Sequence, residues 1–261
     1  MSRLVPYWGG KRNLTKTILN LLPAHQRYCE PFGGSATILL EKSPSPAEVY
    51  NDLNGDLVNL FRVLKYHPRE FLDTVRWHLR SREDFDRFKA LPSRLLTDVH
   101  RAARLYYLLR ANFHAMPPDV RCHFVGKQQG SQRPASIYRI EESLYEIHRR
   151  LENVTIEHLP YNDCIRRYDD PQTLFYCDPP YFNHEKDYGP GVFARDDFTK
   201  LSALLTALRG SFLLSLNDLP EVRQLFSAFH FKEVSTTYSH QKGGTKKVTE
   251  LLIANYPLPQ N

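Results

Sequence analysis

The order of short apolar runs, a glycine turn and amphipathic runs at the start of this chain restricts the folds it can adopt. The run Arg27–Glu30 predicts a buried strand, and Glu48–Asn51 predicts a second one. Between them lie the turn Gly33-Gly34 and the stretch Ser35–Glu41, which predicts a helix. Strand, turn, helix and strand in this order are the opening of a parallel α/β sheet.

The same order returns in the second half of the chain, where strands are predicted over 154–158, 173–177, 211–216, 231–238 and 249–256. The last two can pair as an antiparallel hairpin. By contrast, residues 66–151 show helical patterns and no convincing strand. We therefore predict an α/β fold with a Rossmann-like, mostly parallel sheet, a C-terminal antiparallel hairpin and an inserted, mainly helical domain.

Composition excludes several other classes of protein. Hydrophobic residues make up 41% of the 261 residues and charged residues 25%, which is typical of a folded globular chain rather than a disordered one. No apolar run approaches the ~20 residues of a membrane span, and the first residues do not resemble a signal peptide, so we expect a cytoplasmic protein. The four cysteines and eleven histidines lack metal-ligand spacing, and we expect neither a metal site nor a disulfide framework.

Positive charge is concentrated in the predicted insertion. Between Val99 and Ile140 the only acidic residue is Asp119. The same stretch contains seven arginines and lysines: Arg101, Arg104, Arg110, Arg121, Lys127, Arg133 and Arg139. A local basic field of this kind suits a polyanion such as nucleic acid, although a solvated basic surface would have the same composition.

The glycine turn and the acid after the second predicted strand indicate a nucleoside-type ligand. Gly33 and Gly34 allow close approach of the backbone to a ligand, and the following helix presents N–H donors at its start. Asp52 ends the next strand, where a carboxylate can accept hydrogen bonds from ribose hydroxyls. An ordinary strand-to-helix turn would look similar. The pattern Gly-x-Gly-x-x-Gly is absent, which argues against a nicotinamide dinucleotide and against an oxidoreductase.

The most specific motif is Asp178-Pro179-Pro180-Tyr181, directly after the predicted strand 173–177. Ligands of open α/β sheets bind at this edge. The two prolines lack N–H donors, so the loop offers acceptors only, namely the Asp178 carboxylate and the Pro179 carbonyl. Such acceptors suit the two hydrogens of an exocyclic amine, and Tyr181 can stack on a base removed from a duplex. A rigid surface turn is the alternative interpretation.

In its motifs and their order, the chain resembles the Dam-type DNA adenine N6-methyltransferases over nearly its whole length outside the middle. The motifs that carry the resemblance are Tyr7-Trp8-Gly9-Gly10-Lys11, Glu30-Pro31-Phe32-Gly33-Gly34-Ser35, Asn51–Leu57, Asp178–Tyr181 and Gly243–Leu252. The resemblance implies a Rossmann-like methyltransferase sheet, S-adenosylmethionine as the methyl donor, double-stranded DNA as the partner, and direct displacement at N6 of a flipped adenine. No metal and no covalent intermediate are implied, and we expect a monomer or a weak dimer.

The resemblance also implies roles for individual residues. Tyr7 and Lys11 would contact the cofactor, and Glu30 with the Phe32-Gly33 backbone would lie near its methionine part. Asp52 would hold the ribose hydroxyls, and Asp163 would reach the adenine amino group of the cofactor. Four residues would act on the target adenine, Asp178 also lying near the methyl group: Asp178, Pro179, Pro180 and Tyr181.

The insertion would be the target-recognition domain. The resemblance divides the chain into a discontinuous catalytic domain, 1–65 and 152–261, and a DNA-binding domain, 66–151. Candidate DNA-binding residues are Arg110, Asn112, Arg121, Lys127 and Arg133. Relatives that read a four-base palindrome have an Arg-Tyr-Asn core in their recognition hairpin, whereas this chain has Arg110-Ala111-Asn112. The recognition sequence is therefore not carried over.

Other activities remain open at this stage. The acceptor loop suits any exocyclic amine, so cytosine N4 or an RNA base are alternative substrates. A catalytically idle DNA-binding homologue is a further alternative, against which the intact Lys11, Asp52 and Asp178 argue. Restriction protection, strand marking and evasion of phage defence are all compatible biological roles.

Overall fold

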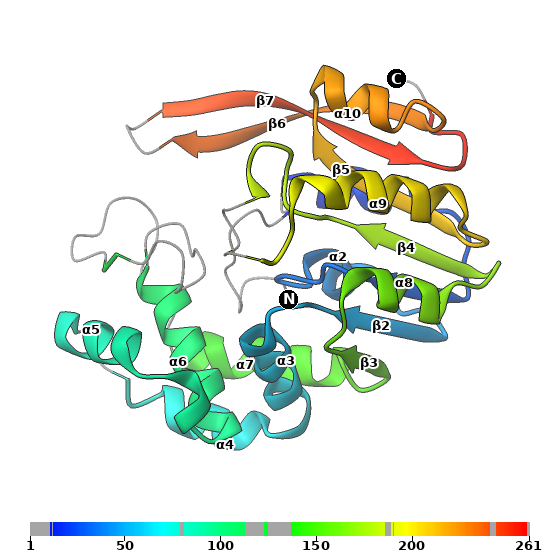
Figure 1. Ribbon diagram of the computed structural model, residues 1–261. Coiled ribbons are helices and arrows are strands. Elements are labelled where there is room, and N and C mark those ends of the chain that lie inside the picture. The colour runs from blue at the N-terminus through cyan, green and yellow to red at the C-terminus, as the bar shows by residue number, and fades with distance from the viewer. Residues whose placement is uncertain are drawn as a thin grey trace.

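The computed structural model describes residues 11, 13–78, 81–112, 123–124, 137–185, 189, 191–240 and 244–259. Side chains are described for these residues except 137–139, 237–240 and 244–247. A seven-stranded sheet forms the centre of the molecule, in the order β3-β2-β1-β4-β5-β7-β6. The predicted α/β class, the mostly parallel sheet and its antiparallel end are confirmed (Figure 1).

Five strands run parallel and two close the sheet in antiparallel fashion. The parallel strands are β1 (Arg27–Glu30), β2 (Ala47–Asn51), β3 (Val154–Glu157), β4 (Thr173–Cys177) and β5 (Ser211–Asn217). The antiparallel strands are β6 (His230–His240) and β7 (Gly244–Ala254), and β7 lies between β5 and β6. The carboxyl ends of β1, β2 and β4 therefore meet at one edge, where the strand order changes direction and ligands of such sheets bind.

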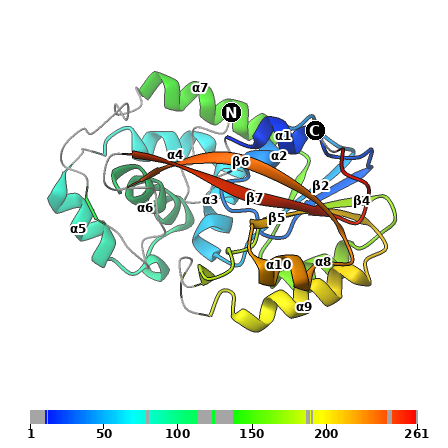
Figure 2. The same cartoon turned by 90° about the horizontal axis from the view of Figure 1, so that it is seen from above.

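Helices cover both faces of the sheet. On one face lie α8 (Tyr161–Tyr168), α9 (Arg195–Thr206) and α10 (Pro220–Leu225), and on the other lie α1 (Thr15–Leu19) and α2 (Thr37–Glu41) (Figures 1 and 2). Strand side chains alternate between the two faces as the pleat requires. Tyr28 and Tyr176 pack with α1 and α2, whereas Cys29 and Phe175 pack with α8 and α9.

The helical group between β2 and β3 lies at one side of the sheet (Figure 1). It consists of α3 (Gly55–Tyr66), α4 (Pro68–Val75), α5 (Arg82–Ala90), the 3₁₀ turn η1 (Ser93–Leu95), α6 (Asp98–Ala111) and α7 (Ile137–Arg150). Side-chain caps begin three of these helices: Asn54 for α3, Ser81 for α5 and Thr97 for α6 each accept a backbone N–H. Between α6 and α7, the described residues contribute one antiparallel bridge, Asn112 with Phe124.

The helical group shares a hydrophobic core with the sheet. Phe61 of α3, Leu105 of α6 and Ile147 of α7 belong to the same buried cluster as Tyr28 of β1. Polar contacts reinforce this packing, since Asp56 of α3 pairs with Arg101 of α6 and the Asn59 amide donates to the Asp98 carbonyl. The division at residues 65 and 152 stays a prediction, and the core is continuous across it.

In the part of the chain that the structure describes, no helix is both long enough and apolar enough to cross a membrane.

Candidate active site

The glycine turn after β1 is tied to the acid after β2. The backbone N–H of Gly34 donates to Asp52 Oδ2 at 2.8 Å, and that of Asn54 donates to Asp52 Oδ1 at 2.7 Å. A Cβ at residue 33 would lie 2.2 Å from the Tyr50 ring, so this position requires glycine. Burial raises the pKa of Asp52 above its ordinary value despite these backbone donors. The turn and the acid therefore form one preorganised unit.

Asn51 joins three loops at this edge of the sheet. Its Nδ2 donates to the carbonyls of Pro31 and Leu159, at 2.9 and 3.0 Å, and its Oδ1 accepts the Leu159 N–H at 2.8 Å. Asn51 itself is fully buried. A buried amide with its hydrogen bonds satisfied fixes the relative positions of the segments after β1, β2 and β3.

Glu30 lies at the end of β1 and is buried. Its Oε1 accepts the Tyr28 hydroxyl at 2.8 Å and the Leu39 N–H at 2.7 Å. The predicted helix α2 therefore donates one of its first N–H groups to the protein's own carboxyl group. Burial raises the pKa of Glu30 to about 8.

Asp178 follows β4 and is held from two sides. Lys11 Nζ lies 2.7 Å from Asp178 Oδ1, and the Ser215 hydroxyl of β5 donates to the same oxygen at 2.8 Å. Within the described residues, both of these contacts are made at Oδ1, so Oδ2 remains for a ligand. Burial raises the pKa of Asp178 and outweighs the opposing effects of Lys11 and Ser215. The Asp178 carboxylate is thus held in one orientation through Oδ1, and among the described residues Oδ2 makes neither of these contacts.

The segment after Asp178 is fixed by the antiparallel end of the sheet. The Tyr181 hydroxyl donates to Glu250 Oε2 of β7 at 2.5 Å. The Asn217 side chain, at the end of β5, accepts the Phe182 N–H and donates to the Phe182 carbonyl, both at 3.0 Å. Lys11 Nζ lies 4.6 Å from the centroid of the Tyr181 ring.

These elements surround a cavity of about 350 Å³, within the usual range for small-molecule sites. Seven of the predicted site residues line it: Lys11, Glu30, Phe32, Gly33, Asp52, Asp178 and Pro180. The ring of Phe32 stacks on that of Tyr161, with centroids 5.2 Å apart, and both contact Phe193 to form an aromatic wall. Tyr181 is next to the cavity through its contact with Lys11, and Pro179 is buried in the loop between Asp178 and Pro180.

One predicted cofactor residue, Asp163, lies outside the lining of the cavity. Asp163 lies on α8 with 54% of its side chain exposed, 3.7 Å from Arg166, and it does not line the cavity. Its neighbour Asn162 lines the cavity instead, because successive residues of a helix point about 100° apart. Tyr7 lies outside the described residues.

Among the candidate DNA-binding residues, the structure describes Arg110 and Asn112. Arg110 is half-buried at the end of α6, with its guanidinium 5.8 Å from the Tyr106 ring centroid. Asn112 is buried, and its Oδ1 accepts the His123 N–H at 2.9 Å. The structure therefore places Asn112 in a buried contact between the end of α6 and residue 123 rather than on the surface. Arg121, Lys127 and Arg133 lie outside the described residues.

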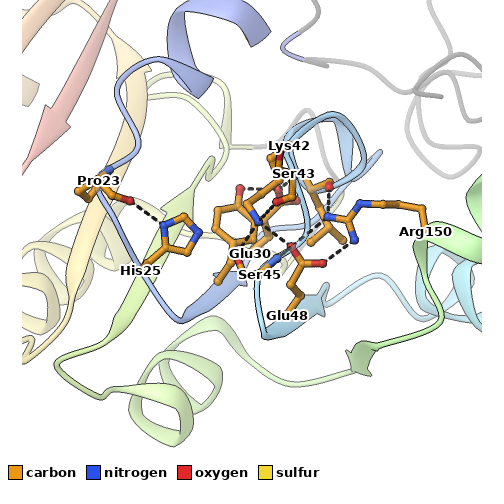
Figure 3. Close-up of polar contacts among 10 residues, drawn as sticks. Pro23, His25, Glu30, Lys42, Ser43, Ser45, Glu48 and Arg150 are labelled. Atoms are coloured by element: carbon orange, nitrogen blue, oxygen red, sulfur yellow. Dashed lines mark hydrogen bonds and ion pairs between the residues drawn. The ribbon is translucent and has the colours of Figure 1, made fainter.

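A second group of buried charges lies outside the lining of the cavity, and we call Lys42, Glu48 and Arg150 the Glu48 cluster (Figure 3). Lys42 Nζ lies 2.6 Å from Glu48 Oε1, and Arg150 of α7 contacts both Glu48 oxygens. Arg150 also donates to the Leu39 carbonyl. The backbone N–H of Leu39 in turn donates to Glu30. Burial raises the pKa of Glu48, but hydrogen bonds from Arg150 and Lys42 outweigh it and hold the pKa below its ordinary value.

The arrangement combines a closed, structural ion cluster with a cavity whose acids retain accepting capacity. Asp52, Asp178 and the Pro179 carbonyl are acceptors, and an aromatic wall and the Tyr181 ring offer flat apolar surfaces. Sequence reasoning missed four residues that orient these groups: Asn51, Ser215, Asn217 and Glu250. Asn51 and Glu250 lie in quoted motifs, but the residue pattern did not distinguish them from ordinary strand residues.

Comparison with known proteins matches nearly the whole chain to one family. A family model described as D12 class N6 adenine-specific DNA methyltransferase matches residues 7–240. A type II methyltransferase of Lactococcus lactis subsp. cremoris, M1.LlaDCHI, is 26% identical over 95% of this chain and 93% of its own length. The DNA adenine methylase of Escherichia coli (strain K12) is 25% identical over 95% and 93%. The Retron Ec67 DNA adenine methylase of Escherichia coli is 21% identical over 98% and 92%.

Proposed function

The chain belongs to the D12 class of N6 adenine-specific DNA methyltransferases, and on that premise we propose that it methylates adenine flipped out of double-stranded DNA, with S-adenosylmethionine as the donor. The observation that supports this proposal most directly is the half-used carboxylate of Asp178 at the cavity. It stands in a loop whose prolines remove competing N–H donors, between an ion pair and a serine hydroxyl. Such a group accepts hydrogen bonds from an amine in one orientation.

The residues that line the cavity support this choice of cofactor, because they include polar groups that could hold it. Asp52 would accept the ribose hydroxyls, and Lys11, Glu30 and the Phe32-Gly33 backbone would hold the methionine part. Gly33 lines this cavity at a position where a Cβ would collide with the buried Tyr50 ring. When bound, S-adenosylmethionine supplies an electrophilic methyl group.

Asp178 and Pro179 would act on the target adenine. Asp178 Oδ2 and the Pro179 carbonyl would accept the two N6 hydrogens, which orients the nitrogen lone pair and stabilises the charge that develops on the amine. Burial raises the pKa of Asp178, so this carboxylate takes up a proton more readily than an exposed aspartate. Tyr181 would stack on the base, and Lys11 would keep Oδ1 occupied.

A calorimetric titration with S-adenosylmethionine tests the cofactor assignment. Asp52→Ala should raise the Kd at least tenfold, because the variant loses the acceptor at the end of β2. Asp163→Ala is the matched control, and its Kd should stay within twofold of wild type because Asp163 lies outside the cavity. Equal Kd values for wild type and Asp52→Ala would contradict the ribose role.

DNA binding by the insertion is a second part of the proposal. Its support is the basic composition of residues 99–140 and the position of the helical group at one side of the sheet (Figure 1). Changing Arg121, Lys127 and Arg133 together to alanine should lower the slope of log K against log salt by about 2–3, with cofactor affinity unchanged. An unchanged slope would place the DNA-binding surface elsewhere, with Lys242–Lys247 as the next candidate.

A further inference from the structure

Glu250 and Asn217 face each other across the antiparallel pair β5–β7, far in sequence from the Asp178 loop. They are direct partners in the strand register, and they hold two consecutive residues of that loop. Glu250 binds the Tyr181 hydroxyl, and Asn217 binds both backbone groups of Phe182. The pair thus forms a cross-strand clamp on the segment that follows Pro180.

The two contacts of the clamp constrain different parts of that segment. Asn217 fixes the backbone, because its amide satisfies the N–H and the carbonyl of one residue at 3.0 Å each. The two backbone contacts of Asn217 do not by themselves set the side-chain torsions of Tyr181. The hydroxyl contact at 2.5 Å restricts these torsions, because it ties the far end of the ring to a fully buried carboxyl group on β7. A phenolic O–H also prefers to lie in the plane of its ring, so the position of the acceptor favours one ring plane.

The positive charge of Lys11 also favours one orientation of the Tyr181 ring. Lys11 Nζ lies on the ring face at 4.6 Å from the centroid, and the same nitrogen pairs with Asp178 at 2.7 Å. A rotated ring would lose the contact with Lys11, whose position holds Oδ1 of the catalytic carboxylate. The plane of the ring and the orientation of the carboxylate are therefore linked through one ammonium group.

We propose that Glu250 is a positioning residue that sets the plane of the Tyr181 ring for stacking on the flipped adenine. This inference rests on the proposed function and deepens it, because it names what orients the stacking surface. Glu250 would touch neither the adenine nor the methyl donor and would act through the Tyr181 hydroxyl. Its contribution should appear in methyl transfer and in base stacking, and not in binding of S-adenosylmethionine or of the DNA backbone.

The test compares Glu250→Ala, Glu250→Gln and Tyr181→Phe in the full-length protein. Glu250→Ala and Tyr181→Phe should each slow single-turnover methyl transfer about tenfold, with the Kd for DNA and for S-adenosylmethionine within twofold of wild type. Glu250→Gln keeps an acceptor oxygen for the hydroxyl and should recover most of the rate. The double variant Tyr181→Phe/Glu250→Ala should be no slower than the slower single variant, since both remove the same contact.

A spectroscopic signal separates positioning from a merely structural role. With 2-aminopurine at the adenine that the wild-type enzyme methylates, its fluorescence change on binding should be altered in Glu250→Ala and Tyr181→Phe alike. The matched control is Glu233→Ala on the neighbouring strand β6, which is exposed and pairs with Arg223. It should leave rate and fluorescence unchanged.

Two results would overturn the inference. One is a wild-type transfer rate in Tyr181→Phe and Glu250→Ala. The other is multiplication of the two losses in the double variant, which would mean that Glu250 acts by another route. If Glu250→Ala does not fold, Tyr181→Phe and Glu250→Gln still decide, because an unchanged Tyr181→Phe excludes the contact. Absence of methyl transfer by wild type would instead refute the proposed function and leave the clamp geometry unaffected.

Discussion

Two carboxylates in this molecule each pair with a lysine, yet their pKa values shift in opposite directions. In the Glu48 cluster, one carboxylate meets Lys42 and Arg150, and both of its oxygens are in contact with a cation. At Asp178, one carboxylate meets Lys11 and Ser215, and only Oδ1 is used among the described residues. The pKa of Glu48 is lowered because its donors outweigh burial, whereas that of Asp178 is raised because burial outweighs its donors.

The difference shows how the fold separates structural from chemical use of buried charge. A carboxylate with both oxygens paired to cations connects elements, here β2, α2 and α7 (Figure 3). A carboxylate that is oriented but incompletely paired can still accept a hydrogen bond from a ligand in the cavity. The first should therefore matter for stability alone, and the second for chemistry alone.

The largest expected effect is on stability. Arg150→Ala removes the donors to both Glu48 oxygens, and breaking a buried ion pair from one side costs about 3–5 kcal/mol. Urea unfolding measures this loss. Arg149→Ala, at the exposed neighbouring position, is the control and should change stability by no more than about 0.5 kcal/mol. The methyl-transfer rate per folded molecule should be unchanged. A lower rate would show that the Glu48 cluster also affects the chemistry.

The converse effect should follow from Asp178→Ala. Loss of the preorganised acceptor should slow methyl transfer by at least ~10²–10³-fold, with little change in the urea midpoint. Single-turnover kinetics with saturating cofactor measure the rate. A variant that keeps a tenth of the wild-type rate, a difference of only about 1.4 kcal/mol, would show that Asp178 is not the main acceptor.

The effect expected at Glu30 depends on pH, and over any one pH unit it is smaller than the two effects above. The pKa of Glu30 is about 8 when folded, against an ordinary value of 4.5, so its contribution to stability is complete below about pH 4.5 and is lost as pH rises to 8. Glu30→Gln removes this titration and keeps the acceptor for Tyr28 and Leu39. Relative to the wild type, the variant should gain up to ~1.4 kcal/mol per pH unit between pH 5 and 8. Parallel stability curves for the two proteins would show that Glu30 is ionised in the folded state.

Much of this site could be predicted from the sequence because its acids follow parallel strands. Glu30, Asp52 and Asp178 stand at the ends of β1, β2 and β4, and parallel topology brings these ends together whatever the details of packing. The acceptor character of the Asp178 loop also depends only on local chemistry, since proline lacks an N–H.

The orienting residues could not be predicted for a related reason. Ser215 and Asn217 reach the loop through the pairing of β4 with β5, and Glu250 reaches it through the pairing of β5 with β7. The registers of these pairings are not visible in a residue pattern. Asp163 shows a different difficulty, because the start of α8 decides whether residue 162 or 163 faces the cavity. The residue pattern around Asn112 likewise does not indicate that its side-chain oxygen accepts the backbone N–H of residue 123.

The most direct test of the account is the identity of the methylated base. Purified protein is incubated with duplex DNA and S-adenosylmethionine labelled in the methyl group, and the DNA is digested to nucleosides that are separated and counted. If the protein transfers the methyl group to adenine N6 with Asp178 as the main acceptor, the label is recovered as N6-methyldeoxyadenosine, and Asp178→Ala gives essentially none. Label in N4-methyldeoxycytidine, or no label in DNA with the wild-type protein, would contradict it.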